Sequence, residues 1–134
     1  MGIAFGRKQV HLEFIEDGDW EGGPLILLYG GPREEIRLLQ DALRSLSGDV
    51  GRRVSIHELP FVRATNACAV VAISENIDRG VATVGPAQFE WGLTPASWNE
   101  VDSLLQGFFD GGGGFQFLNE ASGPTVIYSR RRSW

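Results

Sequence analysis

Cysteine and long apolar runs are nearly absent from this chain of 134 residues, and each absence excludes a class of protein. Because Cys68 stands alone, the chain can form neither an intramolecular disulfide nor a zinc site with several cysteines. No stretch reaches the length of a signal-peptide core or a membrane span, and Gly6 occupies the position that Ser or Thr takes in a myristoylation signal. We therefore predict no membrane association and a cytoplasmic location.

Positive charge is scarce as well, since the chain has 12 Lys and Arg against 17 Asp and Glu, and a net charge of −5. General nucleic-acid binding needs cations that displace the counterions of phosphate, so we do not expect it. An acidic surface is compatible with a basic protein partner. The arginines at 52–53 and 130–132 favour a solubilising role over a nucleic-acid patch, because few aromatic residues lie beside them.

The remaining composition is that of an ordinary globular domain. With 43% hydrophobic and 22% charged residues, the chain can bury a core without disulfides or metal. We find no internal repeat, linker or shift of composition, and we predict one α+β domain over residues 1–134, with a flexible arm at 1–8 and a basic tail at 130–134. The 18 glycines fall partly in clusters, which predicts several tight turns between short elements.

Two segments have the apolar periodicity of amphipathic helices. The first begins at Gly30-Gly31-Pro32, because proline suits the first helical position, and Gly48 ends it. The second begins at Thr94-Pro95, an N-cap side chain followed by proline, and ends at the glycines of 111–114. The apolar stripe of the first helix repeats every three or four residues, at Ile36, Leu39, Leu43 and Leu46.

Alternating or continuous apolar residues predict strands before, between and after these helices. The expected strands cover residues 9–16, 25–29, 53–59, 67–74, 81–84, 88–93, 115–118 and 125–129. Four of them follow one another without a helix between them, which is typical of an antiparallel meander. We therefore predict an α+β fold with a mainly antiparallel sheet of about six to eight strands and two amphipathic helices packed on one face.

Few residues qualify as catalytic groups. Cys68 lies among apolar residues of an expected strand, where a free cysteine behaves as a small hydrophobe. His57 and Glu58 are neighbours, so their side chains would point to opposite faces of a strand, and His11 lies on another expected strand. If the protein is a small enzyme or ligand-binding domain, these two histidines and Glu58 are the expected polar groups of its pocket.

No motif indicates a cofactor or a metal. Gly30-Gly31-Pro32 lacks the G-x-G-x-x-G and G-x-x-x-x-G-K-S/T patterns, and its proline removes one of the backbone N–H groups that would bind phosphate. The acidic residues of segment 16–21 alternate only in part, which favours a solvated turn over a calcium loop. We expect no cofactor and no metal, and we lean against an enzymatic function.

Tryptophan gives a stronger indication of function. Trp98 falls on the apolar face of the second helix, whereas the other three stand beside acidic residues or at the end of the chain. Exposed tryptophan is a frequent anchor of protein interfaces, because it buries a large area with few rotatable bonds. The alternative is that these side chains close the ends of the core. The predicted partner-binding surface has tryptophan anchors with acids for electrostatic steering, at Trp20, Trp91, Trp134, Asp17, Asp19 and Glu21.

Part of the C-terminal half resembles small uncharacterised bacterial proteins. The features concerned are the L-T-x-x-x-W helix start at 93–98, the FQFL run at 115–118, and Ile127-Tyr128-Ser129 followed by Trp134. In size, acidity and α+β layout the chain is also similar to the immunity proteins of bacterial toxin systems. This resemblance implies an inhibitor or accessory role, and it transfers no catalytic residue.

We therefore expect a small acidic protein that acts by protein–protein binding, as an immunity-type inhibitor or an accessory subunit. The alternative is a small enzyme or ligand-binding domain with a pocket between sheet and helices. Self-association through an edge strand is a third hypothesis, which a mass that depends on concentration would reveal.

Overall fold

The computed structural model describes residues 10–18, 21–109, 114–119 and 122–132, and within them the chain forms nine β-strands and two α-helices. The helices are α1 (Arg33–Arg44) and α2 (Pro95–Phe109), and two 3-10 turns lie at Ser45–Ser47 and Ile56–Glu58. The strands are β1 (Val10–Ile15), β2 (Leu25–Tyr29), β3 (Arg53–Ser55), β4 (Val62–Ala64), β5 (Ala69–Ser74), β6 (Gly80–Gly85), β7 (Gln88–Leu93), β8 (Phe115–Asn119) and β9 (Thr125–Ser129).

The strands form two mixed sheets. The five-stranded sheet has the order β4-β1-β2-β9-β8, and the four-stranded sheet has the order β3-β5-β7-β6. Both sheets contain parallel pairs of strands. These are β1 with β4 and β2 with β9 in the first sheet, and β5 with β7 in the second. The α+β class is thus confirmed, whereas the prediction of a single sheet with six to eight strands is wrong, since nine strands form two mixed sheets.

The expected meander does not form in the described residues, because β5 pairs with β7 and not with β6, the strand that follows it. β4, which we did not predict, lies in the five-stranded sheet beside β1. Asn66 and Ala67 then turn the chain back through left-handed backbone conformations, with φ of 57° and 55°. β6 pairs with β7 at the outer edge of the four-stranded sheet, so β5 meets β7 directly and in parallel.

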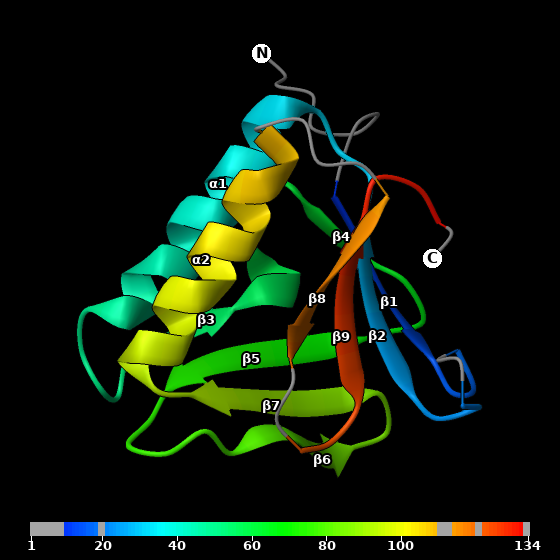
Figure 1. Cartoon of the computed structure of the whole chain (residues 1–134). Helices are drawn as coiled ribbons and strands as arrows, with labels where there is room; N and C mark the ends of the chain where they lie inside the picture. The colour runs from blue at the N-terminus through cyan, green and yellow to red at the C-terminus, as the bar shows by residue number, and fades with distance from the viewer. Residues whose placement is uncertain (1–9, 19–20, 110–113, 120–121, 133–134) are drawn as a thin grey trace.

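Both helices form where the sequence predicts them. Pro32 precedes the first turn of α1, and the predicted apolar stripe of this helix is buried. The Thr94 hydroxyl accepts a hydrogen bond from the Ser97 backbone N–H at 3.3 Å, which caps the start of α2. The two helices lie side by side on the same side of the five-stranded sheet (Figure 1). Neither helix, over the residues described, has the length and apolarity needed to cross a membrane.

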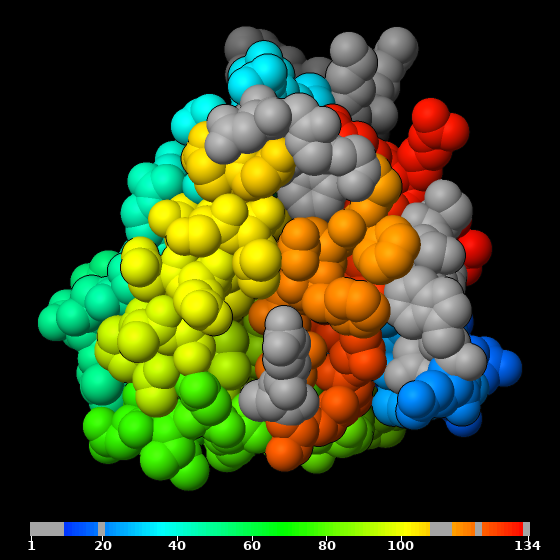
Figure 2. Space-filling model, viewed as in Figure 1, coloured from blue at the N-terminus to red at the C-terminus, as the bar shows by residue number. Residues whose placement is uncertain are grey.

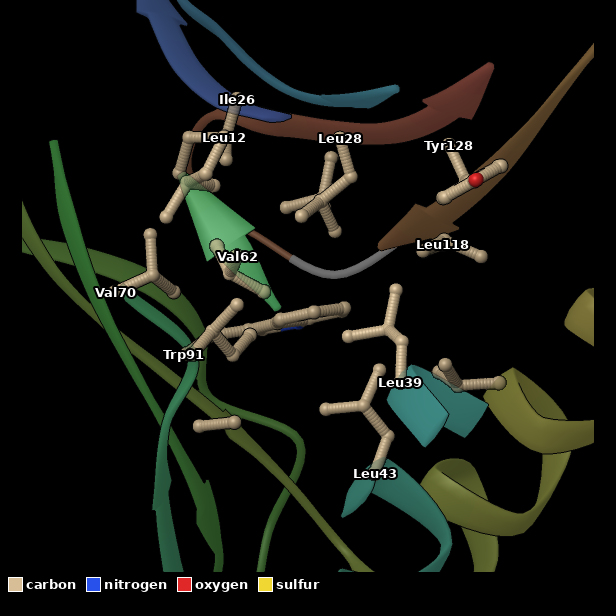
Figure 3. Close-up of a cluster of buried hydrophobic side chains, with 14 of the residues drawn as sticks. Leu12, Ile26, Leu28, Leu39, Leu43, Val62, Val70, Trp91, Leu118 and Tyr128 are labelled. Carbon is tan, nitrogen blue, oxygen red and sulfur yellow. The ribbon is translucent and has the colours of Figure 1, made fainter. Parts of the chain in front are cut away.

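One principal core serves both sheets and both helices. In Figure 1 the strands of the two sheets run roughly crosswise, and the helices close the open side between the sheets. Figure 3 shows side chains that meet there, among them Tyr128 of the five-stranded sheet, Trp91 of the four-stranded sheet and Leu39 of α1. Trp91 also contacts Trp98 edge to face, with ring centroids 4.7 Å apart.

Candidate functional site

The six residues predicted as a binding surface have three different outcomes. Trp91 has no exposed surface, since the alternation of β7 directs its side chain into the core. It therefore cannot anchor a partner, and the expectation that it lies at the surface is wrong. Asp17 and Glu21 are exposed, as electrostatic steering requires. The other three lie outside the described residues: Trp20, Trp134 and Asp19.

The residues of the alternative pocket are dispersed. His11 stacks on Tyr29 of β2, with ring centroids 4.8 Å apart. His57 lies in a 3-10 turn, where its Nδ1 accepts a hydrogen bond from the Val70 N–H at 3.1 Å and its Nε2 lies 3.8 Å from Glu58 Oε2. The expectation that His57 and Glu58 point apart is therefore wrong, because it assumed a strand. Neither of the cavities described below is lined by any of these three predicted residues.

Cys68 is buried, as its apolar neighbours predicted. Only 1% of its surface is exposed, and this burial raises the pKa of the thiol to about 12. The thiolate, which is the reactive form, is therefore scarce near neutral pH. Among the described residues, no group of three or more His, Cys, Asp or Glu is placed to hold a metal ion.

A cavity of about 350 Å³ lies along α2, and we name it the α2 groove. Its volume is at the lower end of the range of ligand pockets, which is about 300 to 1,000 Å³. Apolar side chains of α2, β7 and β8 form its floor, and polar side chains form its rim. The floor residues are Leu93, Val101, Leu104 and Leu118, and the rim residues are Asp78, Ser97 and Glu100.

The rim of the α2 groove carries negative charge. The two carboxylate oxygens of Asp78 accept hydrogen bonds from the Thr94 backbone N–H and from the Ser97 hydroxyl, each at 2.8 Å. These bonds, the one from Thr94 first, hold the pKa of Asp78 below its usual value, so Asp78 is ionised at neutral pH. Glu100 is exposed on α2. Within the described part of the chain, neither carboxylate forms an ion pair.

Phe115 and Phe117 form an exposed aromatic pair on β8. Their side chains are 38% and 37% exposed, and their ring centroids lie 5.8 Å apart at an interplanar angle of 84°. They stand opposite Ser129 and Ile127 of β9, so both rings lie on one face of β8, while Leu118 lines the α2 groove. Figure 2 shows the atoms of β8 at the surface beside those of α2. Phe117 stands opposite Ile127, which packs in a small cluster on the face of the sheet away from the helices, whereas Leu118 packs in the principal core on the helix side. The aromatic pair and the groove therefore lie on opposite faces of β8, which is an edge strand, and a partner that grips this edge can contact both.

Our interpretation of the sequence missed this pair, although a signal was present. The FQFL run places Phe115 and Phe117 two residues apart, which puts both rings on the same face of a strand. The same pattern is equally typical of a strand whose aromatic face is covered. The strand order decides between the two cases, because β8 is the last strand of its sheet and the rings stay partly exposed.

A buried polar junction holds β8 against the four-stranded sheet. Asn119, 5% exposed, accepts a hydrogen bond from the Trp91 indole N–H at 3.3 Å. Its amide group donates to the backbone carbonyls of Ser122 at 3.4 Å and Pro124 at 3.3 Å. The Ser122 carbonyl also accepts from the Val81 N–H of β6 at 2.9 Å. This Asn119 junction fixes the end of β8 that borders the α2 groove.

A second, shallower depression of about 420 Å³ lies on the four-stranded sheet. Its charged groups already compensate one another. Arg79 donates through Nε to the Glu75 carboxylate at 3.0 Å and lies 3.5 Å from Glu90, which in turn lies 3.5 Å from Arg53. The hydrogen bond from Arg79 is the main cause that lowers the pKa of Glu75. Because its acids are paired with arginines, this depression has little charge left for a ligand.

No protein-family model, curated protein or solved structure matches this chain.

Proposed function

We propose that this protein acts by binding another protein, as an immunity-type inhibitor or an accessory subunit does, and that β8 and α2 form the binding surface. The observation that carries the proposal is the pair Phe115 and Phe117, which are 38% and 37% exposed on a strand at the edge of a sheet. Aromatic side chains are enriched in protein interfaces relative to the rest of the surface. Two adjacent rings supply the kind of anchor on which binding energy concentrates.

Phe115 and Phe117 stand out among the aromatic side chains whose exposure the structure describes. None of the others in that set reaches a comparable exposure. The remaining exposed large apolar residues are aliphatic, namely Leu38, Val50, Ile77 and Val84. Single exposed aliphatic residues are common on protein surfaces, whereas an adjacent aromatic pair calls for an explanation.

The molecule is large enough for such an interface. A specific complex buries about 800 Å² on each partner, and this chain exposes 6850 Å² in total. The edge strand β8 carries the aromatic pair on one face and borders the acidic rim of the α2 groove on the other, on a chain whose net charge is −5. The partner that suits this surface is therefore apolar at its centre and basic at its edge.

The proposal is tested with the double variant Phe115→Ser, Phe117→Ser in quantitative affinity capture from the source cells. The matched control is Val50→Ser, Val84→Ser, which removes two exposed apolar side chains that do not line the α2 groove. We expect the native chain and the control to capture one stoichiometric partner, and the phenylalanine variant to lose it. Titration of the purified partner should then show at least about a tenfold loss of affinity for the phenylalanine variant only.

Two results would overturn the proposal. One is a partner that the phenylalanine variant still captures in full, and the other is no stoichiometric partner even after mild cross-linking. Sedimentation equilibrium supplies a further check on the occupant of the surface. If the native chain dimerises and the phenylalanine variant does not, then the surface binds a second copy of the chain and not another protein.

A further inference from the structure

We propose that the α2 groove receives a lysine or arginine side chain of the partner protein. This inference rests on the proposed function, because a partner that grips the edge strand β8 would contact Phe115 and Phe117 on one face and cover the groove on the other. The groove combines an apolar floor with an acidic rim. Lys and Arg have the complementary layout, since their aliphatic stems pack on apolar surface while their cationic ends stay at its border.

The size and lining of the groove suit a single side chain. A volume of about 350 Å³ is small for a cofactor but leaves room for one long side chain. Leu93, Val101 and Leu118 are almost fully buried, and Leu104 is only partly buried. Leu104 is therefore the floor residue with the most apolar surface left for an aliphatic stem to cover.

The helical register of α2 places the acidic rim beside this floor. Residues three or four apart share one face of a helix, so Ser97, Glu100, Val101 and Leu104 all border the groove. Asp78 approaches from the other side and uses one acceptor site on each oxygen for its bonds to α2. A carboxylate has about four such sites, so Asp78 can accept further bonds from a cation.

In the part of the chain that the structure describes, the acids of this rim are not paired with arginines, unlike the acids of the depression on the four-stranded sheet. Glu75 and Glu90 also line a cavity, but arginines of the same chain pair with both of them. Asp78 and Glu100 form no ion pair in the described residues. A cation supplied by the partner would therefore gain the attraction of both carboxylates without first breaking an internal ion pair.

The first experiment probes the groove without the partner. The amides of Nα-acetyl-lysine, Nα-acetyl-arginine and Nα-acetyl-norleucine are titrated into the full chain, and the methyl resonances of Leu93, Val101, Leu104 and Leu118 are followed. A single side chain binds weakly, so the titration extends to about 10 mM. We expect saturable shifts with the two basic amides and much smaller ones with norleucine amide, which has a similar stem and no charge.

Charge variants test whether the acidic rim is responsible for the binding of the basic amides. Glu100→Gln should weaken the binding of both basic amides about two- to fivefold, the effect of losing one exposed charge pair. The matched control is Glu34→Gln, which removes an exposed glutamate from α1 and should leave the titration unchanged. Equal shifts with norleucine amide, no saturable shifts with any amide, or equal effects of the two variants would each overturn the inference.

Affinity measurements with the purified partner test this inference separately from the proposed function. Glu100→Lys places a like charge against the incoming cation and should lower affinity for the purified partner at least about tenfold. If the phenylalanine variant loses the partner and Glu100→Lys keeps full affinity, the proposed function stands and this inference fails. If no partner is recovered at all, the amide titration still decides whether the groove accepts basic side chains.

Discussion

Removal of the Asn119 side chain should destabilise the whole fold, because its amide joins the two sheets. In Asn119→Ala, the buried indole N–H of Trp91 loses its acceptor, and the Pro124 carbonyl loses the donor that Asn119 supplies. A buried polar group without a partner costs about 1 to 3 kcal/mol. The Ser122 carbonyl loses less, since it still accepts from the Val81 N–H.

The three bonds are 3.3 to 3.4 Å long, which places each near the weaker end of that range. We therefore expect Asn119→Ala to lower the free energy of unfolding by about 2 to 3 kcal/mol. For a chain of this length, the midpoint of thermal unfolding should fall by about 6 to 12 °C. Urea denaturation followed by tryptophan fluorescence measures the first quantity, and differential scanning calorimetry measures the second.

A double-mutant cycle identifies the bond that is responsible. Trp91→Phe removes the indole N–H, and the coupling energy between Trp91→Phe and Asn119→Ala should be about 1 kcal/mol. Asn76→Ala, at an exposed position, is the control and should change stability by less than about 0.5 kcal/mol. A loss below that value for Asn119→Ala, or a coupling energy of zero, would refute the account of the junction.

Three further predictions concern stability and reactivity. Gly80→Ala should destabilise the fold by more than about 2 kcal/mol, because φ is +82° and the added Cβ would lie 2.1 Å from the Ser122 carbonyl oxygen. Gly51→Ala, with φ of +99° and open space around it, should cost about 1 kcal/mol, and equal melting temperatures for both variants would contradict this reasoning. The hydrogen bond from Arg132 lowers the pKa of Glu13. The pair therefore stabilises the fold above the unfolded-state pKa of about 4.3, and this stabilisation is lost as the pH falls below that value. Urea midpoints measured across this pH window should fall less steeply for Glu13→Gln than for the native chain, and parallel curves would disprove the contribution. Cys68, whose pKa is raised to about 12, should not react with a thiol reagent at pH near 8 until urea unfolds the chain, and fast labelling of the native state would contradict its burial.

Local signals in the sequence accounted for the helices and for several strands. The stripe from Ile36 to Leu46 has the helical period, and Thr94-Pro95 carries the chemistry of a helix start. Residues within one or two turns determine these features, so no distant part of the chain is needed to predict them. The burial of Cys68 followed in the same way from its apolar neighbours.

The burial of Trp91 could not be predicted from neighbouring residues alone. The alternation of β7 places Trp91 and Glu90 on opposite faces, but it does not say which face is buried. The helices and the five-stranded sheet decide this by covering the Trp91 side, and Asn119 then satisfies its indole N–H. The segment at His57 illustrates the same point, because the second half of an expected strand forms a 3-10 turn in which the Val70 N–H of β5 donates to His57.

The sequence by itself determined the α+β class, the two helices and the acidic net charge. Only the tertiary structure decided the two-sheet arrangement, the parallel pairing of β5 with β7, the exposure of Phe115 and Phe117 on the edge strand β8, and the α2 groove. The physical reason is that helix formation depends on hydrogen bonds between near neighbours, whereas strand pairing joins residues far apart in the chain. Which strand lies at an edge, and so which rings stay exposed, follows from those distant pairings.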